Sequence, residues 1–278
     1  MAQATTSAKS RASARRRAPA TMAADTGKDT EGRSYESVAE LWSKEVQTED
    51  GREKWYAKAR GYWQQQEASI DGVLGGYAET HGPDIRESRR FLEWLQGRTP
   101  APEFGAALDC GAGIGRVTRH LLAPLFRRVD LLEPCPQLLQ RAREDLAGTG
   151  AELFMQSSLQ DFEPEAMRYD VIWAQWVLLY LPDDDLLRFL QRCRSALREG
   201  GFVCVKENLV LEGKWIIDRE DNSIMRTEAQ YKALFRRAGF VVAHELRQTC
   251  WPTGLYPVKM YALRPGGVRA SAGGVAAL

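Results

Sequence analysis

Residues 106–116 (AALDCGAGIGR) join a short, largely apolar run to a loop with glycine at every second position. The segment after the loop has helical spacing, so the loop connects a strand to a helix. Glycines at such a junction let backbone N–H groups at the helix N-terminus approach a ligand closely. In parallel α/β sheets, ligands bind outside the carboxyl ends of the strands, where this loop would lie. The segment therefore predicts an α/β domain with a nucleoside-cofactor site.

The spacing within the loop distinguishes two cofactors. A dinucleotide-binding loop reads G-x-G-x-x-G, but here Arg116 stands where the third glycine is required. A long cation there can reach the carboxylate of an amino-acid moiety, which S-adenosyl-L-methionine has and NAD lacks. Glu133 ends the next predicted strand. An acid at this position accepts hydrogen bonds from the ribose hydroxyls of a nucleoside cofactor. We therefore expect S-adenosyl-L-methionine, and hydride transfer on NAD ranks last among the alternatives.

Predicted strands and helices alternate along the chain. The strands are 106–109, 129–133, 152–156, 169–174, 202–207, 240–245 and 258–263, and the helices are 34–46, 52–66, 84–96, 115–122, 136–146, 183–197 and 228–238. This alternation is typical of a parallel sheet with crossover helices. Together with the S-adenosyl-L-methionine loop, it leads us to expect an α/β class I methyltransferase fold: a Rossmann-like, seven-stranded, mostly parallel sheet with helices on both faces and an N-terminal helical extension. That fold requires the last two strands to form an antiparallel hairpin. The predicted domains are a disordered basic arm (1–33), the methyltransferase domain (34–265) and a flexible tail (266–278).

Charge is distributed unevenly. The net charge is +1, yet residues 1–24 contain Lys and Arg and no acid before Asp25, which leaves the remainder mildly acidic. A core that binds nucleic acid directly is expected to have the opposite sign. An Arg- and Ser-rich arm is typical of an organellar transit peptide, a nuclear address or a solvated tail. We expect a monomer in the cytoplasm or nucleus, with organellar import through the arm as the alternative.

Neither the 5 cysteines nor the 3 histidines have the spacing of a zinc or redox motif. We therefore expect reduced thiols and no metal, and we assign His81, His120 and His244 structural roles. No apolar run is as long as a membrane span requires, so we expect no membrane contact. Trp173 lies within an apolar strand and is expected to be part of the core.

Several stretches carry more specific patterns. They are 62–63 (YW), 71–77 (DGVLGGY), 108–116 (LDCGAGIGR), 159–162 (LQDF), 169–177 (YDVIWAQWV) and 206–208 (KEN). Together they resemble the eukaryotic protein N-terminal methyltransferases, which methylate the α-amine of proteins that begin Xaa-Pro-Lys after removal of Met. The likeness extends from about Trp55 to Leu263. Its LGGY bend and its QW pair are more specific than the glycine loop.

The resemblance implies a cofactor site and a substrate channel. The cofactor residues would be Gly111, Gly113, Arg116, Glu133, Pro134, Leu159, Gln160 and Gln175, with Trp63 closing over them. Leu74 and Trp176 would line the channel, where the flat indole can pack against a proline ring at the second substrate position. Asn208 can both donate and accept hydrogen bonds, so it would hold the peptide backbone beside the first residue.

Residues 218–223 (DREDNS) match the acidic substrate loop of that family. By resemblance, Asp218 and Ser223 would bind the third-position Lys, and Asp221 would face the α-amine, which must lose a proton before it reacts. Tyr180 stands where the better-known animal members have His. A neutral Tyr is a poor base but a good hydrogen-bond partner, so either Asp221 alone or a water molecule removes the proton.

Two other functions remain open at this point. A small-molecule N- or O-methyltransferase would have the same fold, but it would not need an acidic loop that binds a Lys side chain. A catalytically weak, cofactor-binding scaffold is the second alternative. Intact Arg116, Gln175 and Asn208 argue against a scaffold, whereas Tyr180 in place of His favours it. The sequence therefore predicts an S-adenosyl-L-methionine-dependent enzyme that methylates protein substrates with an Xaa-Pro-Lys N-terminus.

Overall fold

The computed structural model describes residues 25–98, 101–211 and 213–266. Most of the predicted arm and most of the predicted tail therefore lie outside the described residues. The helices are α1 (Val38–Glu45), α2 (Glu49–Gln65), α3 (Ile70–Val73), α4 (His81–Gln96), α5 (Pro136–Asp145), α6 (Asp183–Ala196) and α7 (Glu228–Arg237), with short helical turns η1 (Ala78–Thr80), η2 (Thr118–Leu122) and η3 (Leu178–Tyr180). The strands are β1 (Gly27–Asp29), β2 (Ser34–Tyr35), β3 (Ala106–Cys110), β4 (Arg128–Leu132), β5 (Ala151–Met155), β6 (Tyr169–Gln175), β7 (Leu197–Asn208), β8 (Trp215–Asp218), β9 (Ser223–Met225), β10 (Phe240–Arg247) and β11 (Val258–Pro265).

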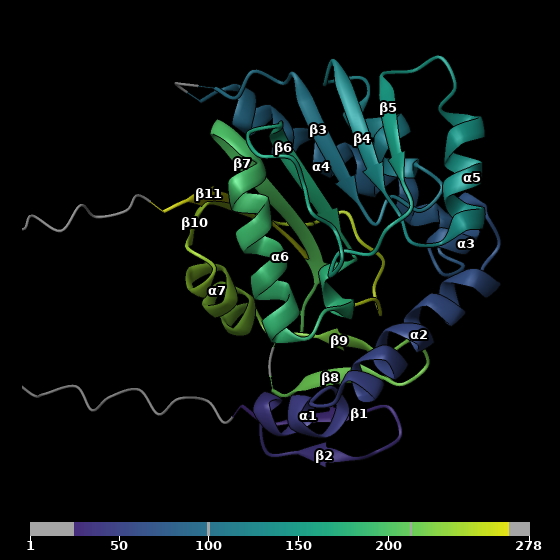
Figure 1. Ribbon diagram of the computed structural model, residues 1–278, viewed down its shortest axis with the longest axis vertical. Helices are drawn as coiled ribbons and strands as arrows, with labels where there is room; N and C mark the ends of the chain where they lie inside the picture. The colour runs from purple at the N-terminus through teal and green to yellow at the C-terminus, as the bar shows by residue number, and fades with distance from the viewer. Residues whose placement is uncertain (1–24, 99–100, 212, 267–278) are drawn as a thin grey trace, which may run out of the picture.

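The central sheet has seven strands in the order β10-β11-β7-β6-β3-β4-β5 (Figure 1). Strand β11 runs antiparallel to both of its neighbours, whereas β3 to β7 are parallel to one another. The predicted class I methyltransferase fold, including its late antiparallel hairpin, is confirmed. The strand order reverses on either side of β3, and the loops after β3 and β6 therefore border the crevice where such sheets bind ligands.

Helices cover both faces of this sheet because alternate strand residues point in opposite directions. In β6, Val171 and Trp173 pack in one cluster with residues of α4 and η2. Ile172 and Ala174 belong to a second cluster, which contains residues of α6 and α7. The side chain of Trp173 is fully buried, as predicted. Strand β6 is therefore packed between two apolar layers, which fix the position of its carboxyl end.

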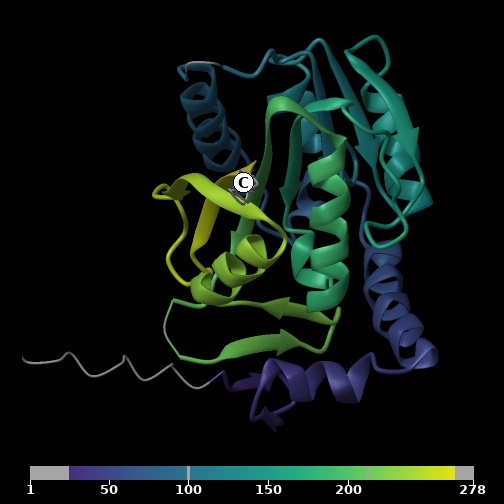
Figure 2. The same cartoon turned by 60° about the vertical axis from the view of Figure 1, so that its left-hand side comes forward.

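A second, smaller sheet of four strands, β2-β1-β8-β9, lies beyond one end of the central sheet (Figure 2). Strand β1 pairs in parallel with β8 through Gly27 and Trp215, and β8 forms an antiparallel hairpin with β9. The aromatic rings of Tyr35 and Trp215 also pack against each other, with their centroids 5.7 Å apart. The sequence reading did not predict this sheet, because strands of two to four residues show no usable periodicity.

Several predicted boundaries are wrong. The helix predicted over 34–46 begins only at Val38, and residues 34–35 form β2 instead. The arm was expected to extend to residue 33, but Gly27–Asp29 forms β1. Asp29 is buried, and its carboxylate accepts bonds from neighbouring backbone N–H groups, which offset the cost of that burial. The strand predicted to begin at residue 202 begins instead at Leu197. Among the described residues, no helix is both long and apolar enough to cross a membrane. Within the same ranges, no group of three or more potential metal ligands is gathered.

Candidate active site

One pocket opens at the carboxyl ends of β3, β4 and β6, with about 1100 Å³ of empty space including its mouth. The residues predicted to bind the cofactor all line it: Trp63, Gly111, Gly113, Arg116, Glu133, Pro134, Leu159, Gln160 and Gln175. Their contacts with a bound cofactor remain predictions. The family resemblance implied most of this set, and the meeting of parallel strand ends at one edge of the sheet accounts for Gly111, Glu133 and Gln175.

The loop after β3 can only be built with glycine. Gly111 and Gly115 have φ angles of 68° and 74°, which side chains rarely adopt. A Cβ at Gly111 would lie 2.6 Å from Val177, and one at Gly115 would lie 2.6 Å from Leu146. At Gly113, by contrast, a Cβ would come no closer than 3.6 Å to Val73, so the bare backbone borders open pocket space. The loop therefore presents its backbone to a ligand, as the predicted cofactor requires.

Glu133 is fixed beside this loop. Its carboxylate accepts hydrogen bonds from the N–H groups of Gly113 (2.9 Å) and Cys135 (2.8 Å). Burial raises the pKa of Glu133 to about 7, although both backbone donors oppose the shift. A buried acceptor at the end of β4, next to an open glycine loop, fits the ribose of a nucleoside cofactor.

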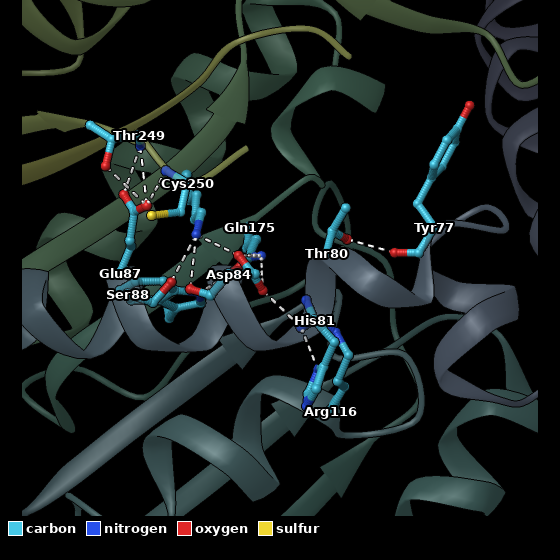
Figure 3. Close-up of polar contacts among 12 residues, drawn as sticks. Tyr77, Thr80, His81, Asp84, Glu87, Ser88, Arg116, Gln175, Thr249 and Cys250 are labelled. Carbon is cyan, nitrogen blue, oxygen red and sulfur yellow. Dashed lines mark hydrogen bonds and ion pairs between the residues drawn. The ribbon is translucent and has the colours of Figure 1, made fainter. Parts of the chain in front are cut away.

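Arg116 is held by a carboxylate that the sequence reading did not single out. In Figure 3, Asp84 of α4 lies at the centre of a polar cluster, where its Oδ2 accepts a bond from Arg116 Nη1 (2.7 Å). Gln175 Nε2 donates to the same carboxylate at 2.9 and 3.0 Å, and Lys206 Nζ donates to its Oδ1. His81 Nδ1 lies 3.2 Å from Arg116 Nη1. This contact is consistent with the structural role predicted for His81.

Asp84 and Lys206 are completely buried. Burial alone would raise the pKa of Asp84, but the charges of Lys206 and Arg116 outweigh it and hold that pKa below its usual range. Arg116 still has further N–H groups and lines the pocket. The cluster thus fixes a cation at the pocket wall, as recognition of an amino-acid carboxylate requires. The only sequence signal for Asp84 was a carboxylate at the start of an amphipathic helix.

Trp176 follows β6 in a strained backbone conformation, with a φ angle of 53°. Its indole N–H is buried without a hydrogen-bond partner among the described residues. The ring lies 5.9 Å from that of Trp251, whose loop is tied to α4 because Glu87 accepts the N–H groups of Thr249 and Cys250 (Figure 3). Trp176 therefore presents an aromatic wall to the pocket, and its role with substrate remains a prediction.

Tyr180 connects the pocket to the small sheet. Its hydroxyl accepts a bond from Trp63 Nε1 (2.9 Å) and donates one to Asp221 Oδ2 (2.9 Å). Burial raises the pKa of Tyr180 well above its usual value, and the charge of Asp221 raises it further. Burial also raises the pKa of Asp221. Tyr180 is therefore a neutral hydrogen-bond donor in this arrangement, and the Asp221 carboxylate accepts its hydrogen bond.

The other residues predicted to bind substrate do not line the pocket. Leu74 follows α3, Asn208 ends β7, and Asp218 pairs with Ser223 across the β8–β9 hairpin. Asp221 Oδ1 accepts the N–H of Ser223 (2.9 Å), which shapes the hairpin turn. The structure thus brings Asp218, Asp221 and Ser223 together, whereas Leu74 and Asn208 approach from other elements. Their contacts with a peptide remain predictions.

Glu207, beside Asn208, is a second residue that sequence reasoning missed. Its Oε1 accepts the N–H groups of Val177 (3.0 Å) and Leu178 (2.8 Å), which fixes the turn that carries Tyr180. Burial raises the pKa of Glu207 to about 8. The motif KEN contained this residue, but nothing in the sequence indicated that the side chain supports the turn after Trp176.

Residues 51–264 match the protein family described as AdoMet-dependent proline di-methyltransferase. "Alpha N-terminal protein methyltransferase 1" of Arabidopsis thaliana is 44% identical over 249 residues, which cover 85% of this chain and 90% of that protein. "N-terminal Xaa-Pro-Lys N-methyltransferase 1" of Danio rerio is 43% identical over 215 residues, or 75% of this chain and 95% of that protein.

Solved structures agree with this match. A SAM-dependent methyltransferase from Leishmania major superposes with a TM-score of 0.83 at 39% identity, covering 89% of this chain and 100% of that one. The complex of DhpI with SAH has a TM-score of 0.58 at 19% identity, covers 77% of this chain and 98% of that one, and is similar in fold alone.

Proposed function

The chain belongs to the AdoMet-dependent proline di-methyltransferase family, and from that membership we propose that it methylates the α-amine of proteins that begin Xaa-Pro-Lys. S-adenosyl-L-methionine is the cofactor, and it supplies an electrophilic methyl group on a sulfonium. The observation that supports this proposal best is the bond from Tyr180 to Asp221, which joins the pocket to the acidic hairpin. A cofactor pocket and a peptide-binding hairpin therefore meet at one hydrogen bond.

The chain's own residues hold the cofactor in a fixed orientation. The bare backbone of Gly111 and Gly113 borders one end of the pocket, and Glu133 offers an acceptor for ribose hydroxyls. Arg116 would bind the cofactor carboxylate, and Asp84 already fixes its guanidinium, so little side-chain freedom would be lost on binding. The Asp84 cluster thus lowers the entropic cost of cofactor binding.

Proton removal from the substrate falls to Asp221. An α-amine has an ordinary pKa of about 7.7–8.0, so it needs only a nearby acceptor to become a nucleophile near neutral pH. Tyr180 donates to Asp221 and keeps that carboxylate oriented. Trp176 would pack against the second-position proline, and Asn208 would hold the peptide backbone. Together they would place the neutral amine in line with the methyl group of S-adenosyl-L-methionine.

The same geometry serves mono-, di- and trimethylation, since the amine loses one proton before each transfer. Asp218 and Ser223, paired across the hairpin, would bind the ammonium group of the third-position Lys. A small neutral substrate has no group for these residues to bind. The hairpin therefore favours a protein substrate over a small molecule.

The test is to incubate the full chain with labelled S-adenosyl-L-methionine and an Ala-Pro-Lys peptide, and to locate the label by mass spectrometry. We expect label on the α-amine of that peptide and none on its N-acetylated form. Label on small amines but never on a peptide α-amine would contradict the proposal. Cofactor binding without transfer to any substrate would favour the scaffold function instead.

The hairpin's role is tested by charge reversal at Asp218. We expect Asp218→Lys to abolish turnover of Xaa-Pro-Lys peptides while cofactor affinity stays unchanged, because Asp218 does not line the cofactor pocket. Glu220→Lys is the matched control, since Glu220 is the exposed acid in the same turn. Unchanged peptide kinetics for Asp218→Lys would remove its assignment as the Lys-binding residue.

We also propose that the protein works as a monomer in the cytoplasm or nucleus. Light scattering of the purified chain tests the first point. Fusion of residues 1–33 to a fluorescent protein tests the second, because import into an organelle would carry the fluorescence with it. Direct binding of nucleic acid is not part of the proposed function, since the chain without its arm is mildly acidic.

A further inference from the structure

Residues 25–45, here called the N-terminal brace, lie before residue 51, where the family match begins. The brace comprises β1, β2 and α1. It supplies two of the four strands of the small sheet, and the other two are β8 and β9 of the acidic hairpin. Figures 1 and 2 both show the purple N-terminal segment alongside the green β8. The hairpin of the shared domain is therefore completed by a segment outside the family match.

The brace holds the hairpin at Arg219, the residue directly after Asp218. The Nε of Arg219 donates to Asp29 Oδ2 (3.0 Å), and one Nη donates to Glu45 Oε1 (2.7 Å). The same Nη donates to the hydroxyl of Tyr35. Only 8% of Arg219 is exposed. All these acceptors come from the brace, so the brace anchors the guanidinium.

The backbone of the turn is held as well. The N–H of Arg219 donates to Thr30 Oγ1 (2.9 Å), and the N–H of Thr30 donates to the carbonyl of Ile217 (3.0 Å). Packing below the turn is equally close, because a Cβ at Gly27 would lie 2.1 Å from the ring of Trp215. Each contact involves a residue of β8 or the turn that separates Asp218 from Asp221.

A two-stranded hairpin is marginally stable in water, and three or more strands are needed for independent stability. Strands β8 and β9 have only four and three residues. Without the brace, the bond of Asp221 to Tyr180 and that of Asn222 to the carbonyl of Trp55 would still tie the turn to the domain, but the outer edge of β8 would be unsupported. With β1 and β2 added, the turn is fixed before a ligand arrives, which removes an ordering cost from binding.

We propose that the N-terminal brace preorganises the acidic hairpin for the substrate, with Thr30 and Asp29 as positioning residues. This inference rests on the proposed function, because it assigns peptide binding to that hairpin. Loss of a brace contact loosens the turn and weakens peptide binding. The cofactor pocket is unaffected, since no residue of the brace lines it.

The experiment compares Thr30→Val, Thr30→Ser and Asp29→Asn in the full chain. Val has the shape of Thr but no acceptor for the Arg219 N–H, whereas Ser retains the hydroxyl. Glu31→Gln is the control, since that side chain pairs only with exposed Arg33. The measurements are KM and kcat for an Ala-Pro-Lys peptide, the Kd for S-adenosylhomocysteine and hydrogen exchange of residues 215–225.

We expect Thr30→Val to raise the peptide KM severalfold, and Asp29→Asn to raise it about tenfold, as for loss of a charge-assisted hydrogen bond. Hydrogen exchange of residues 215–225 should become faster in both variants. Thr30→Ser and Glu31→Gln should behave like the unmodified chain. The turnover number and the Kd for S-adenosylhomocysteine should change by less than about twofold in any variant.

The proposal would be overturned if Thr30→Val and Asp29→Asn both left the peptide KM and the hydrogen exchange of residues 215–225 unchanged. An equal rise in the Kd for S-adenosylhomocysteine would overturn it too, because that result indicates general loosening of the fold. If the unmodified chain methylates no Xaa-Pro-Lys peptide, the proposed function fails. Hydrogen exchange then still decides whether the brace orders residues 215–225, so the two failures are distinguishable.

Discussion

The cofactor side and the peptide side of this molecule are built in different ways. The cofactor pocket depends on a loop of six residues, 111–116, placed at the end of a buried strand in a seven-stranded sheet. The acidic hairpin depends on a four-stranded sheet whose halves come from residues 27–35 and 215–225. The glycine loop lies in one short segment and can be found from sequence, whereas the pairing of distant strands that supports the hairpin cannot.

The two sides also differ in how their charges are solvated. The ion pair of Asp84 with Lys206 is completely buried, whereas Asp218 and Asp221, the acids of the hairpin turn, are only half-buried. Removing one partner of a buried pair is costly because the other charge is left in a medium of low polarity. Changes on the cofactor side should therefore affect stability first, and changes on the peptide side should affect substrate affinity and rate.

The largest effect is expected for Asp84→Asn. This change leaves Lys206 and Arg116 without their buried counter-charge, so we expect the free energy of unfolding to fall by about 3–5 kcal/mol. Urea denaturation measures the loss. Asp50→Asn is the control, because Asp50 and Lys54 form an ion pair that is 74% exposed on each side and contributes no more than about 1 kcal/mol. Equal losses for both variants would contradict the distinction between the two sides.

Asp221→Asn should have the next largest effect, and on catalysis alone. The change retains the side-chain shape but removes the proton acceptor, so we expect kcat/KM for an Ala-Pro-Lys peptide to fall about 100-fold. Isothermal titration with S-adenosylhomocysteine should give the same Kd as for the unmodified chain. Glu220→Gln changes the neighbouring acid and should leave both values unaltered. A weakened Kd in Asp221→Asn would show that the two sides are not separable.

Cofactor affinity should depend on pH through Glu133. The pKa of Glu133 is raised to about 7 by burial, so the carboxyl is neutral below that pH and charged above it. Ribose hydroxyls donate to the charged form, so cofactor binding releases a proton. We expect the Kd for S-adenosylhomocysteine to rise by up to about tenfold per pH unit as the pH falls below 7. In Glu133→Gln this slope should disappear, and persistence of the slope would assign it to another group.

The smallest effect is expected for Tyr180→Phe, which breaks the bond between the two sides. The variant loses the hydroxyl that accepts from Trp63 and donates to Asp221. A net hydrogen bond contributes about 0.5–1.5 kcal/mol, so we expect kcat to fall by about two- to tenfold. Steady-state kinetics at saturating peptide and cofactor check this value. A loss as large as that of Asp221→Asn would make Tyr180 the main proton carrier.

The central sheet and the cofactor pocket were predictable because each depends on local pattern. Gly111, Glu133 and Gln175 each follow an apolar strand, and parallel strands end at one edge. Asp84 was not predictable, because its role depends on Lys206, which is 122 residues away in the chain. A polar residue at the start of an amphipathic helix is ordinarily a solvated one, and only tertiary packing shows otherwise.

The small sheet escaped prediction for a similar reason. Strand β1 has three residues and β2 has two, which is too short for alternation of apolar and polar side chains to be visible. The acidic hairpin was identified through the family resemblance, but the resemblance did not extend to the brace. Arg219 was accordingly treated as part of an acidic loop, whereas it is the buried anchor of that loop.

The pairing of β1 with β8 has a consequence for how the chain is made. Thr30 and its partner Arg219 are 189 residues apart. A ribosome adds about 5–20 residues per second, so β1 waits about 10–40 s for its partner to be synthesised. During that time β1 can pair with β2, but the edge that later receives β8 stays open to pairing with another chain. Chains that stop before residue 215 would carry this exposed edge permanently, and aggregation is the expected fate of such fragments.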